Sequence, residues 1–241
     1  MSGHSKWSTI KHQKSANDSK RGKLFSKLAK DIAVAVREGG GPDPITNPKL
    51  RLMIEKARTV NFPKNNIQRA IDKGAGEGEG VRLETIIYEG FGPQNLAACI
   101  IECVTDNRNR CNQEVKAYLD KNGGRLGSSG AVSYLFEKKG WILVEKQGDE
   151  EEQTLKLIDC GTQDFESDQE GIVLYTQPGQ LHQVVEAVRK AGFTVKDAEL
   201  IFKSKAEKLL EENQKEKIEK FLEGLDDLGD VQRIFTDIKL N

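Results

Sequence analysis

Basic side chains gather at the start of the chain and could bind phosphate there. The first 22 residues carry Lys6, Lys11, Lys14, Lys20 and Arg21. Lysine and arginine bind phosphates through charge and counterion release, and a tryptophan such as Trp7 can stack on an exposed base. We therefore predict a basic N-terminal arm that contacts a nucleic acid, with anchoring against a folded domain as the alternative function of Trp7.

Lysines also recur along one side of a predicted helix that begins at Lys23. At about 100° per residue, its apolar residues share one arc. These residues are Leu24, Phe25, Leu28, Ile32, Ala35 and Val36. The other arc carries Lys20, Lys23, Lys27 and Lys30. We favour phosphate binding by this row over a merely solvated face, because it continues the basic arm and the later helices add cations. The added cations are Lys49, Arg51, Lys56, Arg58, Lys64, Arg69 and Lys73.

Two arginines lie in the segment Thr105–Arg110, between a predicted strand and a predicted helix. Thr, Asn and Asp in such a segment can cap the helix N-terminus. Arg108 and Arg110 would then lie beside the positive end of the helix dipole, which favours an anionic partner. We predict that both contact the nucleic acid, with pairing to nearby carboxylates as the alternative.

No pattern predicts catalytic residues, a metal site or a cofactor. The four cysteines lack CxxC spacing, and Cys99 and Cys103 would share one face of a strand as core residues. The glycine-rich segment Asn122–Gly130 follows a helix and lacks the GxxxxGK[ST] pattern of a nucleotide site. No apolar run is long enough to cross a membrane, and Met1–Trp7 has no signal-peptide core, so we expect a cytoplasmic protein without membrane contact.

Charge is distributed unevenly along the chain, although the net charge is −1. Residues 1–74 contain 16 Lys and Arg against 6 Asp and Glu, whereas the remainder contains 21 against 32. This asymmetry indicates that the basic end meets a polyanion and that the acidic end avoids it.

The basic arm, residues 1–22, precedes a predicted helical domain of residues 23–76. Three signals delimit its helices: an Asn47-Pro48 N-terminus, a start at Pro63 and a stop at Gly74. Glycines then alternate through residues 74–80, which is typical of a linker.

The rest of the chain alternates strands and helices. We predict a complete βαββαβ set in residues 138–204, inserted in a discontinuous α+β domain of residues 81–137 plus 205–241. Strands of the discontinuous domain are predicted at Leu83–Tyr88, Leu96–Val104, Val132–Phe136, Lys205–Leu210 and Val231–Ile238. Its last helix is predicted to start at Asn213, because Asn213 and Glu216 have the spacing of a capping box.

Several motifs resemble the YebC/PmpR family, which includes a mitochondrial translational activator. They follow the family's order along essentially the full chain: Met1–Trp7, Ile10–His12, Lys20–Lys23, Asn47-Pro48, Tyr88–Gly90, Thr105–Arg110 and Asn122–Gly124. The resemblance implies a multidomain α+β fold in which an N-terminal three-helix bundle precedes two ferredoxin-like α+β domains, one inserted in the other. Members are described as DNA-binding transcriptional regulators or as ribosome-associated translation factors that relieve stalling. The family supplies no catalytic residue to transfer.

Together these observations predict a non-enzymatic, nucleic-acid-binding regulator of gene expression. Its partner would be duplex DNA or ribosomal RNA, and through that RNA the ribosome. We favour RNA, because A-form RNA is read by shape, phosphate and unpaired bases, and no helix is clearly marked for reading base edges. The alternative is a protein-interaction scaffold that acts through the acidic α+β domains.

Overall fold

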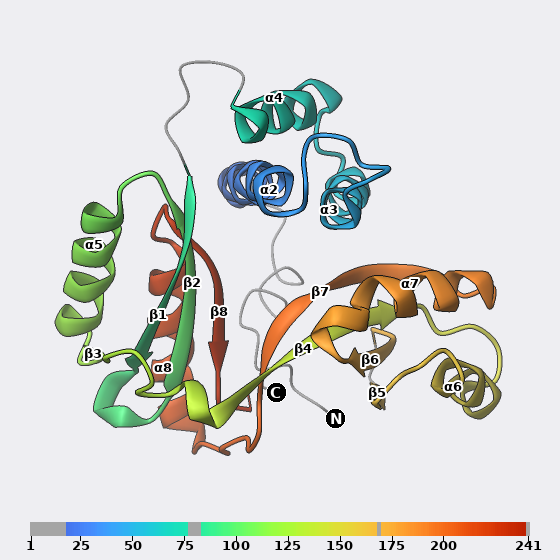
Figure 1. The fold of residues 1–241 in the computed structure, drawn as a ribbon. Coiled ribbons are helices and arrows are strands. Elements are labelled where there is room, and N and C mark those ends of the chain that lie inside the picture. The colour runs from blue at the N-terminus through green and yellow to red at the C-terminus, as the bar shows by residue number, and fades with distance from the viewer. Residues whose placement is uncertain (1–17, 77–82, 168–169, 240–241) are drawn as a thin grey trace.

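The protein is described by a computed structural model that covers residues 18–76, 83–167 and 170–239. In this part of the chain, three helices precede two four-stranded antiparallel sheets, as Figure 1 shows. The three helices are α2 (Asp18–Glu38), α3 (Pro48–Thr59) and α4 (Lys64–Ala75). The strands are β1 (Glu84–Phe91), β2 (Ala98–Thr105), β3 (Arg125–Leu126), β4 (Phe136–Val144), β5 (Asp164–Ser167), β6 (Ile172–Thr176), β7 (Val195–Ser204) and β8 (Val231–Thr236). The remaining α-helices are α5 (Arg108–Lys121), α6 (Glu150–Ile158), α7 (Leu181–Lys190) and α8 (Glu212–Asp226).

The three N-terminal helices form a bundle around one small apolar core. Ile32 and Val36 of α2 pack there with residues of α3 and α4. Asn47 caps α3 as predicted, since its side chain accepts a hydrogen bond from the Leu50 amide. The buried Asn47 amide group also donates to the carbonyl of Ala35, so the cap ties the start of α3 to α2.

Two helix ends differ from the prediction. Helix α2 begins at Asp18 rather than Lys23, and Arg21 in its first turns lies 5.3 Å from the ring centroid of Phe25. Helix α4 continues past Gly74 and is capped by Gly76, whose φ is 82°. Gly74 instead faces α2, where a Cβ atom would lie 2.6 Å from the carbonyl oxygen of Ala33. That glycine is therefore needed for helix packing and does not end the helix.

The two sheets have equivalent strand orders, β3-β1-β2-β8 and β5-β6-β4-β7. The second sheet has the ferredoxin-like connection β4-α6-β5-β6-α7-β7. In the first sheet, β1 occupies the position that β6 occupies in the second sheet. The two sheets therefore have the same spatial arrangement of strands, although the strands follow one another along the chain in a different order. The first sheet combines residues before and after those that form the second.

The C-terminal part of the first sheet corrects three predictions. Lys205–Leu210 is not a strand: Lys208 makes only an isolated bridge to Ile238, and β1 fills the position that this segment was expected to occupy. Residues 205–209 are exposed, Leu209 by 81%, and only Leu210 of this segment packs against the core. Helix α8 begins at Glu212, and its capping box joins Glu211 and Gln214 rather than Asn213 and Glu216.

The region before β4 also differs from the prediction of a strand at Val132–Phe136. Ser133–Leu135 is a short 3-10 turn, and β4 begins at Phe136. The carboxylate of Glu89 explains this conformation, because it accepts backbone hydrogen bonds from Gly130, Val132 and Ser133 at 2.7 to 2.8 Å. These hydrogen bonds lower the pKa of Glu89 although its burial would raise it.

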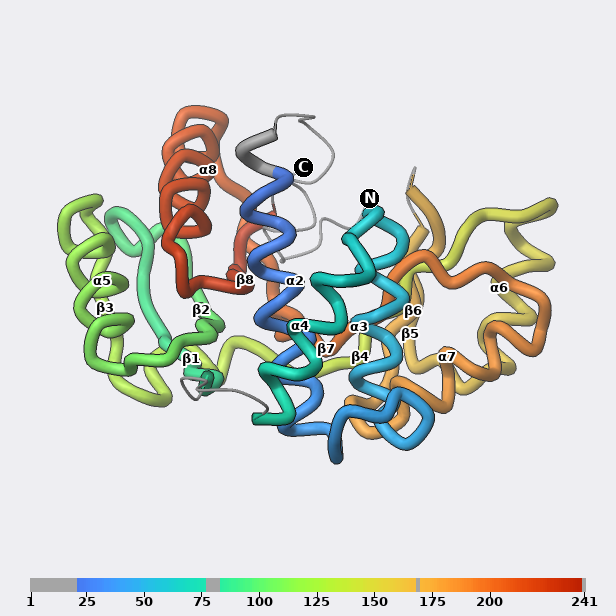
Figure 2. The backbone as a smooth tube through the Cα atoms, turned by 90° about the horizontal axis from the view of Figure 1, so that it is seen from above, coloured from blue at the N-terminus to red at the C-terminus, as the bar shows by residue number. Residues whose placement is uncertain are grey.

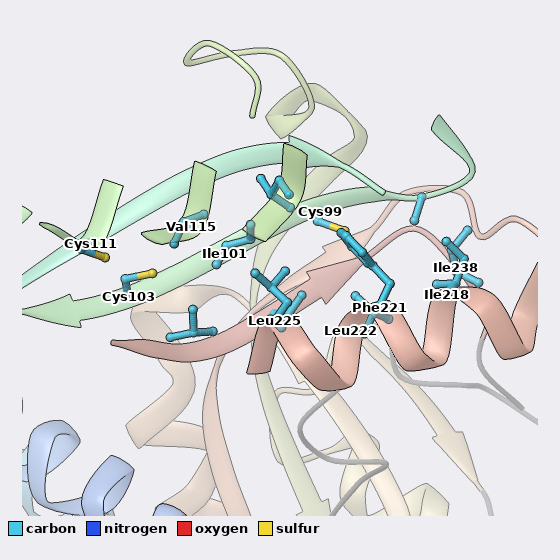
Figure 3. Packing of buried hydrophobic residues seen from close by; sticks show 14 residues of the cluster. Cys99, Ile101, Cys103, Cys111, Val115, Ile218, Phe221, Leu222, Leu225 and Ile238 are labelled. Atoms are coloured by element: carbon cyan, nitrogen blue, oxygen red, sulfur yellow. The ribbon is translucent and has the colours of Figure 1, made fainter. Parts of the chain in front are cut away.

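Each sheet packs against other elements on both faces, although the edge strands stay partly exposed, as at Ile87 of β1. Helices α5 and α8 cover one face of the first sheet, where Cys99 and Cys103 are fully buried core residues as predicted (Figure 3). Helices α6 and α7 cover one face of the second sheet. The other faces of the two sheets pack against each other and form a separate apolar core between them. In this core the rings of Phe202 and Phe235 meet edge to face, with their centroids 5.4 Å apart.

The helical bundle lies across the two sheets with α2 at its centre. Figures 1 and 2 show α4 on the side of α2 that is turned away from the sheets. A small apolar cluster joins the bundle to the first sheet through Ala33 and Val34 of α2, Leu83 and Val104. Leu52 of α3 packs against the core of the second sheet, and ion pairs join the bundle to both sheets.

Candidate nucleic-acid interface

The lysines on one side of α2 face carboxylates. The pairs, with their nitrogen to oxygen distances, are Lys23–Asp227 (2.9 Å), Lys27–Asp226 (2.6 Å) and Lys30–Asp230 (2.9 Å). We call the three lysines the lysine row. Their partners lie at the end of α8 and in the turn before β8, 199 residues beyond Lys27 in the case of Asp226. The side chains of Lys27 and Lys30 are only 21% and 23% exposed. The lysine row therefore fastens the bundle to the first sheet.

Asp230 joins both groups of predicted cations. One carboxylate oxygen accepts from Lys30, and the other accepts from Arg110 and from the hydroxyl of Thr105, both at 2.8 Å. Burial alone would raise the pKa of Asp230, but these hydrogen bonds outweigh it and lower the pKa. Arg110 also pairs with Asp106 at 2.8 Å. The start of α5 and the lysine row thus meet at one carboxylate.

Arg233 lies where the bundle and both sheets meet. Its guanidinium pairs with Asp31 of α2 at 3.1 Å, with Glu102 of β2 at 3.0 Å and with Glu199 of β7 at 3.7 Å. Burial opposes the charge, but Asp31 and Glu102 raise the pKa of Arg233. Lys56 of α3 extends this network to the second sheet, since it also pairs with Glu199. The bundle is consequently docked on both sheets through charges.

The outer face of α4 carries cations that remain exposed. Ile67, Ala70, Ile71 and Gly74 are buried against the bundle, which turns the remaining positions of α4 outward. The outward cations are Lys64, Arg69 and Lys73, which we call the α4 face.

None of the α4-face cations forms an ion pair within the described residues, and the carboxylate of Asp72 beside them accepts a hydrogen bond from Gln68. Arg58, near the end of α3, is likewise exposed without such a partner in that part of the chain. The α4 face is therefore available to phosphate groups.

The other predicted site residues occupy different surroundings. Lys6, Trp7, Lys11 and Lys14 lie outside the described residues, as does the side chain of Lys20. Arg21 is exposed beside Phe25. Arg108 is exposed at the first position of α5, which Asn107 caps by accepting a hydrogen bond from the Arg110 amide.

The sequence contained a signal for the α4 face, but the prediction gave it little weight. Lys64, Arg69 and Lys73 were counted only as additional cations, because the lysine row is longer and more regular. The signal lies in α4 itself, whose apolar residues share one face and leave these cations outside it. By contrast, the partners of the lysine row lie far away along the chain and cannot be matched to it by local pattern.

Two features are absent from the described residues. No group of His, Cys, Asp and Glu there is arranged to hold a metal ion. No helix there combines the length and apolar composition that crossing a membrane requires.

The fold and its charged junctions define a multidomain protein with a helical N-terminal part and two α+β units. Comparison with known families assigns it further. A family model described as the TACO1/YebC protein N-terminal domain matches residues 5–77, and one described as the TACO1/YebC second and third domain matches residues 83–238. The chain belongs to the TACO1/YebC family.

Related proteins match over nearly their full lengths. A protein of Thermoanaerobacter pseudethanolicus is 46% identical, over 100% of this chain and 98% of its own. A protein of Listeria monocytogenes serotype 4b is 42% identical, over 100% of both chains. Both are named probable transcriptional regulatory protein. The crystal structure of a conserved hypothetical protein from Aquifex aeolicus matches with a TM-score of 0.84 and 44% identity, over 92% of this chain and 91% of that one.

Proposed function

We propose that this protein is a non-enzymatic regulator of gene expression that binds nucleic acid through the α4 face of its helical bundle. The observation that carries the proposal is the exposure of Lys64, Arg69 and Lys73 without carboxylate partners in the described part of the chain. Phosphate binding by such cations releases counterions and requires no base-specific contact. The naming of relatives as probable transcriptional regulatory proteins supports a regulatory role.

RNA with unpaired bases is the ligand that we favour within this proposal. The α4 face presents three exposed cations spread over the outward half of a helix, which suits phosphate contacts to an A-form or irregular RNA surface. The predicted contacts Arg21, Arg108 and the basic arm would add to this surface, with Trp7 available for stacking. Ribosomal RNA, and so the ribosome, is the partner class that this chemistry fits. The cytoplasm is the compartment that it implies.

The proposal is tested by a triple variant of the full chain, Lys64→Ala/Arg69→Ala/Lys73→Ala. Its matched control, Lys116→Ala/Lys121→Ala/Lys190→Ala, removes three exposed lysines from α5 and α7. Binding to a stem-loop RNA and to a random duplex DNA is titrated across salt concentrations. We expect affinity to fall about tenfold or more at low salt, and the slope of log affinity against log salt on duplex DNA to fall by up to ~3, one unit for each lost phosphate contact.

The control variant should retain most of the affinity, because it has the same change in net charge at another place. Equal losses in both variants would show a nonspecific charge effect and would remove α4 as the interface. Tighter binding to the duplex than to the stem-loop would make DNA the ligand.

A second candidate function, a protein-interaction scaffold, has one observation in its favour. Leu155 and Ile158 on the acidic helix α6 are 66% and 44% exposed. Phe165 of β5 is 39% exposed and lies opposite Leu174 of β6, which belongs to the core that α6 covers. Phe165 therefore lies on the same side of the second sheet as α6. Loss of regulatory activity in Leu155→Ser/Ile158→Ser, together with full activity of the α4-face variant, would favour this function.

A further inference from the structure

The acidic partners of the lysine row occupy an unfavourable place in their own helix. Asp226 ends α8 and Asp227 is its C-cap residue, with no basic residue in the last turn. Negative charge at a helix C-terminus is repelled by the helix dipole. The two aspartates are compensated from elsewhere, by Lys27 and Lys23 of the bundle. With Asp230 they form a short acidic segment, the acidic latch, that lies along the lysine row.

The contacts between the acidic latch and the lysine row are fewer and more exposed toward the start of α2. Lys30 is held by Asp230 and by the carbonyls of Gly229 and Val104, at 2.8 to 3.0 Å. In the described part of the chain, Lys23 pairs with Asp227, and both side chains are 49% exposed. Ion pairs at exposed sites are weakened by salt and by competing anions. A polyanion can therefore begin to displace the acidic latch at Lys23.

The rest of the contact between the bundle and the first sheet includes a small apolar patch and the ion pair of Asp31 with Arg233, which must also separate on opening. Its apolar part consists of the small side chains of Ala33 and Val34 against Leu83 and Val104. Junctions between domains that are mostly polar permit relative motion, whereas large apolar junctions do not. The lysine row can thus be exposed without unfolding the bundle, whose own core lies on the other side of α2.

We propose that the acidic latch, Asp226, Asp227 and Asp230, occupies a second nucleic-acid-binding surface, the lysine row, and that nucleic acid gains this surface by displacing the latch. This inference rests on the function proposed above. Binding begins on the exposed α4 face, and the lysine row joins after the bundle lifts from the first sheet. The apparent affinity of the lysine row for nucleic acid is its intrinsic affinity multiplied by the fraction of molecules that are open.

The test uses the full chain and a stem-loop RNA of random sequence at low salt. The latch variant is Asp226→Asn/Asp227→Asn, and a second version adds Asp230→Asn. A control, Glu151→Gln/Glu152→Gln/Asp159→Asn, neutralises three exposed carboxylates on and just after α6. If a tenth of the wild-type molecules are open, we expect the latch variants to bind about tenfold more tightly and the control to change by less than about twofold.

Adding Lys23→Ala/Lys27→Ala/Lys30→Ala to a latch variant should remove the gain, because those lysines would make the new contacts. Far-UV circular dichroism verifies folding, and the two-site latch variant serves if Asp230→Asn unfolds the chain. Latch variants that bind no more tightly than the control would overturn the latch while leaving binding at the α4 face intact. Absence of binding by every variant, wild type included, would overturn the proposed function and the latch with it.

Discussion

The molecule contains two junctions of opposite chemistry. The sheets meet through aromatic and branched side chains, with Trp141, Tyr175 and Phe235 each at most 3% exposed. The helical bundle meets the sheets through ion pairs, among them the lysine row and the contacts of Arg233, and through smaller apolar contacts such as that of Leu52. Apolar burial does not depend on ionic strength in this way, whereas exposed ion pairs are screened by salt.

The two junctions therefore differ in whether they can open: the one between the sheets stays closed, and the one between the bundle and the first sheet can open. The two α+β units should behave as one rigid body, since parting them would expose a large apolar surface to water. The bundle can lift from the first sheet when a competing polyanion replaces the carboxylate partners of the lysine row. The α4 face stays exposed in either state, because it does not take part in the junction.

The largest expected effect comes from the apolar junction. Phe235→Ala removes a fully buried ring that contacts Phe202, and we expect a loss of about 3–5 kcal/mol in the free energy of unfolding. Urea unfolding followed by circular dichroism measures it. Phe165→Ala is the control: this ring is 39% exposed and its loss should cost roughly 1 kcal/mol or less. Equal losses in the two variants would contradict the description of the sheet junction as a buried core.

Periodicity and capping residues predicted most of the secondary structure. Asn47-Pro48 predicted the start of α3 correctly, because an N-cap and a first-turn proline act through local geometry alone. The prediction of a strand at Lys205–Leu210 was wrong. Whether a short segment of polar and apolar residues joins a sheet depends on whether another strand already occupies that position in the sheet. In this fold β1, more than a hundred residues earlier, fills it.

The candidate site was harder to predict from the sequence for a related physical reason. A row of lysines on one helix face looks the same whether it faces solvent, phosphate or carboxylates. Asp226, which pairs with Lys27, lies 199 residues away, so only the folded arrangement reveals the pair. The α4 face was more predictable, because its exposure follows from the amphipathic pattern of the helix itself.

A smaller effect is expected at Asp230 in the charged junction. The pKa of Asp230 is lower in the folded protein than in the unfolded chain, where it is about 4. Its carboxylate therefore stabilises the fold at pH values above about 4, and this contribution disappears as the pH falls through the pKa of the folded protein. Near neutral pH, Asp230→Asn should lower the free energy of unfolding by about 1–3 kcal/mol, because Lys30 and Arg110 lose a charged acceptor.

The pH dependence makes this second test specific. Urea unfolding of wild type and Asp230→Asn, repeated at decreasing pH, should give a difference that shrinks below about pH 4. A difference that stays constant over the acidic range would mean that the Asp230 charge does not stabilise the junction.

The smallest effects distinguish pairs within the lysine row. A double-mutant cycle with Lys27→Ala and Asp226→Ala should give a coupling energy of about 1 kcal/mol, and one with Lys23→Ala and Asp227→Ala roughly 0.3 kcal/mol. The physical reason is solvent: the first pair is 21% and 10% exposed, whereas both members of the second are 49% exposed. Raising the salt concentration should reduce both couplings. If the Lys27–Asp226 coupling kept its full value at high salt, ionic competition could not open the junction, and the contrast with the apolar junction would disappear.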